Sequence, residues 1–207
     1  LKYRQDSEVL PIHDMITDDA LPEGFRKKVL NYTRKDMVLI NGKFVPKKRQ
    51  EIVSQLFKYE TRQLSIDEIL QRTADVFEQN NIPHNFYENR RAFKAWVEHQ
   101  TDFIVVQGEK ARYYRLDELN VEYLVKQLRL DEYHNVILSV RLFFDENPEL
   151  MKEFNILDEY ELHYILRNTQ DRWNPDNIKN LTFGRMPTLE FGKGNVVQQI
   201  QSLVEET

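Results

Sequence analysis

Apolar residues recur at helical spacing in the first half of the chain and predict three successive helices there. These helices cover residues 47–62, 66–80 and 86–100. Ser65 and Glu68 have the spacing of a capping box, in which the serine oxygen accepts from the amide of the residue three positions later. We therefore expect the second helix to begin directly after Ser65.

The third of these helices is strongly amphipathic when it is drawn at about 100° per residue. The residues expected on or beside its buried face are Phe86, Phe93, Trp96 and Val97. The opposite face carries Arg91 and Lys94, with Arg90 at its edge. This pattern predicts a helix that packs through one side and leaves a basic side open.

Two further segments predict β-hairpins. Met37–Pro46 contains Asn41-Gly42 between two apolar runs, which is the strongest short hairpin signal in the chain. The segment 103–115 also alternates between apolar and polar positions, and Gly108-Glu109 is its expected turn.

A two-residue turn in the second hairpin would pair Ile104 with Tyr113 and Val105 with Arg112. Paired residues share a face of the hairpin, so one face would be largely apolar and the other would carry positive charge. We expect Tyr113 in the core and Tyr114 half exposed.

The segments 25–45 and 93–113 read alike. Each begins with a short basic helix, continues through a Thr and an apolar run, and reaches a turn centred on glycine. The two glycines, Gly42 and Gly108, are 66 residues apart. Repetition at a fixed separation indicates repeated structural units.

The second half of the chain predicts more helices and one strand-like segment. The expected helices cover 121–129, 134–146, 148–155, 158–169 and 196–205, and the strand-like segment covers 183–191. The expected fold class is mainly α with small β-hairpins, an α+β protein. Three domains are expected. Residues 1–45 form a partial or degenerate unit that ends in a hairpin, and residues 46–116 form a complete unit. Residues 117–207 form an acidic, mostly helical domain, with a third, degenerate copy of the same unit as the alternative.

Charge is distributed unevenly along the chain. The net charge is −5, yet residues 24–115 hold eighteen basic and eleven acidic side chains, whereas residues 116–207 hold nine basic and seventeen acidic ones. Local field, rather than net charge, steers a polyanion toward a protein surface. The basic block coincides with the two similar segments and indicates a surface for nucleic acid.

Composition narrows the chemistry. The chain has no cysteine, which excludes disulfides, thiolate metal sites and a cysteine nucleophile. No apolar run approaches the roughly 20 residues of a membrane span, so no membrane partner is expected. The first residue is Leu1 rather than Met, and we expect a segment of a larger cytoplasmic protein.

The sequence gives little support for a catalytic site or a metal site. Glu159 and His163 have a helical spacing that could hold a metal ion, but no third ligand lies nearby in the sequence. Glu190 and Lys193 would point to opposite faces of a strand, whereas a nuclease site needs convergent groups. We expect no catalytic residue, no metal and no cofactor.

The order of three helices and a β-ribbon at 47–116 resembles the winged helix-turn-helix superfamily, and the repeated segment looks like two such units in tandem. The resemblance covers about 90 residues of the 207. It implies DNA binding, with helix 86–100 as the recognition helix in the major groove and the ribbon 103–115 as a wing on the backbone. A minority of the superfamily binds protein partners instead.

The residues expected to contact double-stranded DNA are Arg90, Arg91, Lys94, Lys110, Arg112, Arg115, Arg26, Lys27 and Lys43. The run Lys47-Lys48-Arg49 adds positive charge at the start of the first predicted helix. The leading hypothesis is a non-enzymatic DNA-binding segment. The alternative is a protein-interaction module whose acidic C-terminal half docks a partner.

Overall fold

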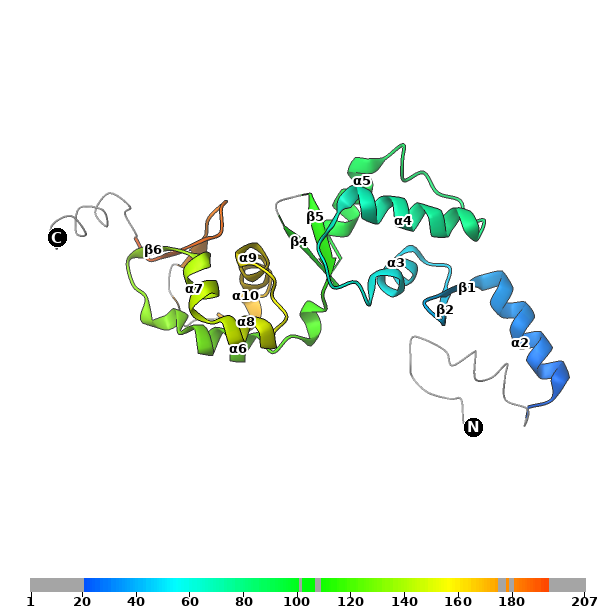
Figure 1. Cartoon of the computed structure of the whole chain (residues 1–207), viewed down its shortest axis with the longest axis horizontal. Coiled ribbons are helices and arrows are strands. Elements are labelled where there is room, and N and C mark those ends of the chain that lie inside the picture. Colours follow the sequence, from blue (N-terminus) through cyan, green and yellow to red (C-terminus); the bar gives the residue numbers. More distant parts are fainter. Residues whose placement is uncertain (1–20, 101, 107–108, 175–177, 179–180, 194–207) are drawn as a thin grey trace. The chain divides into compact units, whose positions relative to one another are not determined.

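The computed structural model describes residues 21–100, 102–106, 109–174, 178 and 181–193 (Figure 1). The fold combines helices with small antiparallel sheets, so the predicted α+β class is confirmed. The chain divides into two compact units, Leu1–His99 and Gln100–Thr207. The domain boundaries expected at 45 and 116 remain predictions, and the helix expected at 196–205 lies outside the described residues.

The first unit contains a long helix that leads into a β-hairpin (Figure 1). Helix α2 spans Glu23–Asp36, and strands β1 and β2 span Met37–Ile40 and Lys43–Pro46. Ile40 pairs with Lys43, and the two residues between them, Asn41 and Gly42, have φ of 48° and 75°. Positive φ at both central positions is the requirement of a type I′ turn. The predicted hairpin is therefore confirmed.

Three more helices and a short strand follow in this unit. Helix α3 spans Arg49–Phe57, β3 spans Leu64–Ser65, α4 spans Ile66–Gln79 and α5 spans Arg90–Glu98. The Ser65 hydroxyl accepts from the Glu68 amide at 3.1 Å, so the predicted start of α4 is confirmed. Helix α3 ends earlier than predicted, where the Asn41 side chain donates to the carbonyls of Gln55 and Leu56 at 2.8 and 3.2 Å.

Aromatic side chains join α4 to α5. The Phe86 ring centroid lies 5.0 Å from that of Phe77 on α4 and 5.1 Å from that of Phe93 on α5. All three rings are buried, as is Val97 on the same face of α5. Tilted and edge-on pairs at this separation are the favoured aromatic geometry. The apolar face of α5 is thereby fixed against α4.

The second unit begins with another hairpin and continues through helices into a second sheet. Its first elements are β4 (Phe103–Val106), β5 (Lys110–Tyr113), the 3-10 helix η1 (Leu116–Glu118), α6 (Val121–Leu128) and η2 (Leu130–Glu132). They are followed by β6 (Val136–Ser139), α7 (Val140–Glu146), α8 (Pro148–Glu153), α9 (Glu159–Asn168), α10 (Gln170–Trp173), β7 (Leu181–Phe183) and β8 (Thr188–Phe191).

The helix predicted at 134–146 is wrong over its first part. Val136–Ser139 forms β6, and the helix begins only at Val140, after the Ser139 hydroxyl accepts from the Arg141 amide. Strand β6 pairs antiparallel with β8, which also pairs with β7, so the strand order is β6-β8-β7. A short apolar run fits either a strand or a buried helix, and here distant pairing with β8 decides.

Helix α9 is central to the second unit (Figure 1). It packs against β4, α7 and α10, and Leu162, Ile165 and Leu166 on it are fully buried in the core of this unit. The Asp158 carboxylate caps the helix by accepting from two backbone amides at 3.0 and 2.9 Å. The cap confirms the predicted start of this helix.

Candidate nucleic-acid interface

Helix α5 has one buried and one open face, as predicted. Phe93 and Val97 are buried, whereas Arg91 is exposed and Lys94 is half-buried. The first turn of α5 contains no acidic residue. No carboxylate within that turn therefore offsets the positive charge of Arg91. The helix dipole favours negative charge in the first turn, so a positive charge there is unusual.

Arg90, at the edge of this face, is held by a carboxylate of α4. Its Nε and Nη2 atoms donate to the two carboxylate oxygens of Asp67, the second at 3.1 Å. The hydrogen bond from Arg90 lowers the pKa of Asp67. The side chains of Arg90 and Asp67 are 42% and 66% exposed, so this ion pair orients Arg90 more than it stabilises the fold.

The sequence predicts Trp96 in the core, but its side chain is half-buried. The Arg49 guanidinium carbon lies 5.4 Å from the Trp96 ring centroid and 4.9 Å from that of Phe86. Both distances are within the range of cation–π contacts. Arg49 is the first residue of α3, and its contact with α5 gives no signal in the sequence beyond a basic run.

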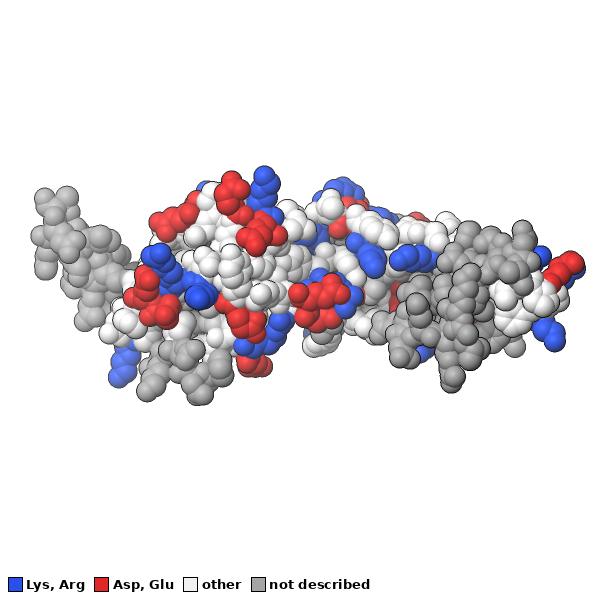
Figure 2. Space-filling view, turned by 90° about the horizontal axis from the view of Figure 1, so that it is seen from below, with Lys and Arg blue, Asp and Glu red and all other residues white. Residues whose placement is uncertain are grey.

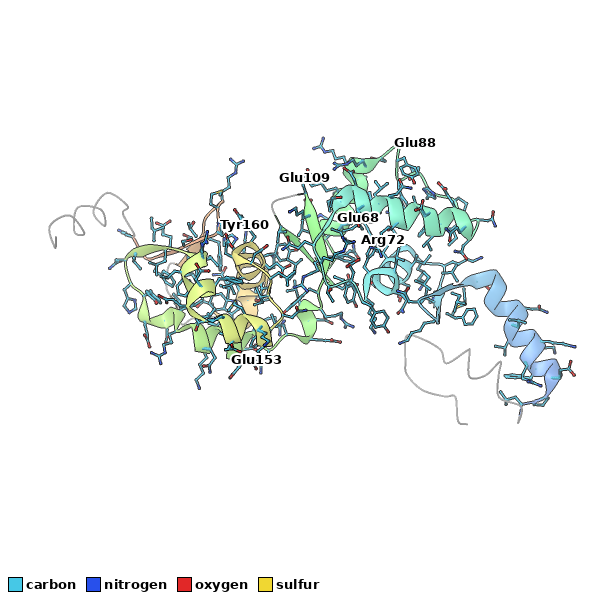
Figure 3. All side chains as sticks on the ribbon, in the orientation of Figure 1. Glu68, Arg72, Glu88, Glu109, Glu153 and Tyr160 are labelled. Atoms are coloured by element: carbon cyan, nitrogen blue, oxygen red, sulfur yellow. The ribbon has the colours of Figure 1, made fainter. Side chains whose placement is uncertain are left out.

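Other arginines of the first unit are paired with carboxylates. Arg62 and Arg72 both bind Glu60, at 3.3 and 2.8 Å, and Arg62 also binds Glu68 at 3.0 Å. Figure 3 labels Arg72 and Glu68, both on α4. The hydrogen bond from Arg72 is the largest cause of the lowered pKa of Glu60. These two arginines stabilise the turn between α3 and α4 and are unsuited to reach a partner.

The predicted register of the second hairpin is wrong by one residue. Ile104 pairs with Arg112, and Val106 pairs with Lys110, so three residues rather than two connect the strands. Because side chains alternate between faces, a shift of one residue exchanges the two faces of one strand. Arg112 therefore shares a face with the core residue Ile104 rather than with Val105.

Arg112 is consequently not available to DNA, and its expected role as a contact is corrected. The residue is 2% exposed, and its partner Glu161 on α9 is 0% exposed. Arg112 Nε donates to Glu161 Oε1 at 2.8 Å, and its Nη2 donates to Glu161 Oε2 at 2.7 Å and to the Asn155 carbonyl at 2.7 Å. A buried charge is retained only when it is paired in this way.

Tyr114 is half-buried, as expected, and packs beside this buried pair. Its hydroxyl donates to the Phe154 carbonyl at 2.7 Å, and the Arg112 guanidinium carbon lies 5.1 Å from its ring centroid. Burial raises the pKa of Tyr114 to about 12. Tyr113 is half-buried, so the expectation that it would be the core tyrosine is also wrong. The hairpin thus turns one face toward the core of the second unit.

The remaining basic residues of this hairpin differ in their surroundings. Arg115 donates to both carboxylate oxygens of Asp117, at 3.1 and 2.7 Å, and also lies 3.1 Å from Glu118. Two nearby carboxylates thus offset its charge. Lys110 is exposed at the start of β5.

The three basic residues expected from the first repeat lie on α2 and β2. Lys27 pairs with Glu23 one turn earlier at 2.7 Å, on the solvent-exposed side of α2. Arg26 is half-buried, and Lys43 is exposed beside the type I′ turn. None of the three is on the same element as Arg91 and Lys94.

His163, considered above as a candidate metal ligand, is a buried titratable group. It is 9% exposed, its ring lies 5.6 Å from that of Phe183, and within the described part of the chain its Nε2 atom has no hydrogen-bond partner. Burial, followed by the positive charge of Arg167, lowers its pKa. No group of three potential ligands for a metal ion occurs among the described residues.

The surface of the second unit mixes charges of both signs. Figure 2 shows acidic and basic side chains interspersed over this unit, on the left of the view. Among the exposed ion pairs of this unit are Arg141 with Asp145, at 3.2 Å, and Arg129 with Glu132, at 3.9 Å. Its net negative charge is therefore not gathered into a purely acidic patch on this face.

Comparison with known proteins finds no match among protein families, curated proteins or solved structures. Over the part of the chain that the structure describes, no helix combines the length and apolar character needed to cross a membrane.

Proposed function

We propose that the chain is a non-enzymatic, tandem winged-helix segment that binds double-stranded DNA through the open face of α5. The observation that carries the proposal is the contrast between the two faces of this helix. Phe93 and Val97 fix it to α4, and Arg91 is exposed on the other side, with no acidic residue in the first turn. A helix with this division fits a major groove, where Arg pairs with guanine or phosphate.

The order of elements supports the winged-helix part of the proposal. In the second unit the order of elements is α6, η2, β6, α7, α8, α9, α10, β7 and β8, and β8 lies between β6 and β7 in the sheet. Helices followed by an antiparallel hairpin are the pattern expected of a winged unit. In the first unit, α2 leads directly into β1 and β2, as the repeated segment suggested.

The second unit is a poorer candidate for duplex contact. Its helix α9, which would be the recognition helix, is enclosed by β4, α7 and α10. Arg112 of the hairpin is buried against α9, and Arg115 is paired with Asp117. We therefore assign the DNA contact to the first unit and a structural role to the hairpin face that carries Arg112.

Binding of a fluorescently labelled duplex, followed by anisotropy, tests the proposal. Affinity should fall steeply between about 50 and 200 mM salt, because the Lys and Arg side chains that contact phosphates displace counterions from the DNA. The double variant Arg91→Ala/Lys94→Ala should weaken binding at least about fivefold and reduce the salt slope by up to about 1.8.

A matched control removes the same charge from the second unit. Arg141 and Lys152 are exposed on α7 and α8, and Arg141→Ala/Lys152→Ala should leave both the affinity and the salt slope nearly unchanged. Equal weakening in the two double variants would indicate a general charge effect and would contradict a specific role for α5.

A second candidate is a protein-interaction module, and exposed apolar side chains in the first unit favour it. Leu39 on β1 is 56% exposed, and Phe25 on α2 is 45% exposed. Exposed apolar side chains mark a protein contact where they form one contiguous patch. Association with a protein partner that survives nuclease treatment and is lost in Leu39→Ser would favour this candidate over DNA binding.

A further inference from the structure

Arg49 differs from the paired arginines of the first unit. Arg62, Arg72 and Arg90 are each bound to a carboxylate. Within the described residues Arg49 forms no ion pair, and its guanidinium instead lies over the rings of Phe86 and Trp96 at 4.9 and 5.4 Å. The residue is exposed. A cation is thus held in place without being neutralised.

Stacking leaves the hydrogen-bonding capacity of a guanidinium intact. The guanidinium carbon lies over both rings, and among the described residues none of the five N–H donors of Arg49 makes a hydrogen bond. These donors match the oxygens of a phosphate group and can bind two of them at once. Two aromatic contacts also reduce the freedom of the side chain, so less conformational entropy is lost when a ligand binds.

The stacked guanidinium lies on one flank of the open face of α5. At about 100° per residue, Trp96 and Lys94 fall on opposite sides of the buried line through Phe93 and Val97. Arg49 therefore supplies positive charge on the Trp96 side, and Lys94 supplies it on the other. Between them lies the strip of α5 that carries Arg91, which is exposed.

We propose that Arg49 is a backbone contact of the DNA site, held against α5 by its stack on Phe86 and Trp96. This inference depends on the proposed function, because it adds a phosphate-binding group to that same site. Arg49 comes from α3, so the site is built from two helices rather than from α5 alone. The ligand group is a phosphodiester oxygen next to the groove that α5 enters.

The test compares four chains by anisotropy of a labelled duplex at several salt concentrations: wild type, Arg49→Ala, Arg49→Lys and Lys58→Ala. Lys58 is exposed directly after α3, so Lys58→Ala removes an equal charge from a position away from the stack. Arg49→Ala should weaken binding several-fold and reduce the salt slope by about 0.9, whereas Lys58→Ala should change neither. Arg49→Lys retains the charge without the flat stacking surface and should lie between wild type and Arg49→Ala.

A fold control compares the urea-unfolding midpoints of the Arg49 variants and wild type, followed by Trp96 fluorescence in a Trp173→Phe background, because the chain has two tryptophans. The midpoint is used because Arg49 contacts Trp96 and its replacement changes the emission directly. An unchanged salt slope in Arg49→Ala, with weakened binding in Arg91→Ala/Lys94→Ala, would overturn the role of Arg49 and leave the proposed function standing. Full recovery of binding in Arg49→Lys would overturn the role of the stack. Absence of duplex binding by the wild-type chain would overturn the proposed function and this inference together.

Discussion

Glu161→Gln is expected to destabilise the second unit strongly, because it leaves the buried charge of Arg112 without a counter-charge. The Glu161 carboxylate accepts from Arg112 Nε and Nη2 at 2.8 and 2.7 Å, and from the Leu157 amide at 2.9 Å. Glutamine has nearly the same volume, but one of its two terminal groups is a donor. The NH2 group of glutamine would replace one of the two carboxylate oxygens and would face an N–H donor of Arg112.

The size of the expected stability loss follows from the burial of both side chains of the ion pair. Arg112 and Glu161 are 2% and 0% exposed, so water cannot replace the lost interaction. Removal of one partner from a buried ion pair costs about 3–5 kcal/mol. Replacing both partners by apolar residues, as in Arg112→Met/Glu161→Leu, is often neutral or stabilising, because neither charge then has to be desolvated. The double variant should therefore be more stable than Glu161→Gln.

Urea unfolding followed by Trp173 fluorescence in a Trp96→Phe background measures the second unit by itself. Trp173 is buried in the core of that unit and reports its loss. Arg115→Ala, which removes the exposed pair with Asp117, is the matched control and should cost only about 0.2–1 kcal/mol. A loss below about 1 kcal/mol for Glu161→Gln, or a double variant no more stable than it, would refute the reasoning.

Two further predictions concern one unit each. The pKa of His163 is lowered below its ordinary value of 6.5, so the unfolded chain binds a proton at higher pH than the folded one. The contribution of neutral His163 to the stability of the second unit should thus be fully present above pH 6.5 and decrease as the pH falls below it. His163→Gln should flatten this pH dependence of the urea midpoint. An unaltered dependence would show that other groups cause it. In the first unit, Ser65→Ala removes the cap of α4 and should cost about 1 kcal/mol, measured by Trp96 fluorescence in a Trp173→Phe background. The corresponding cap variant of α7, Ser139→Ala, should leave the Trp96 transition unchanged, and equal effects of the two variants would contradict a local role for the cap.

The features that could be predicted from sequence are those set by neighbouring residues. Asn41-Gly42 fixes a type I′ turn through its own backbone conformation, and Ser65 caps α4 through a residue three positions away. The amphipathic pattern of α5 likewise depends only on helical periodicity. Each of these signals involves residues close together in the sequence, so contacts with distant parts of the chain had little influence on them.

The features that were missed depend on partners far along the chain. Strand β6 forms in place of a helix because β8, about 50 residues later, pairs with it. Arg112 was expected on the surface because its partner Glu161 is 49 positions away, and because one extra residue in the connection reverses its face. The stack of Arg49 on Trp96 was missed for the same reason, since it joins two helices. Charge and spacing alone do not distinguish a solvated arginine from a stacked or buried one.

The pairing of Arg112 with Glu161 also limits how this protein can change over evolution. In any descendant that keeps the same packing, a neutral residue at either position leaves an unpaired buried charge at the other. The two single replacements are therefore less stable than the original pair or the double replacement. The two positions should therefore be inherited together or replaced together. A lineage that has lost one of them alone would need another cation or carboxylate nearby to take over its role.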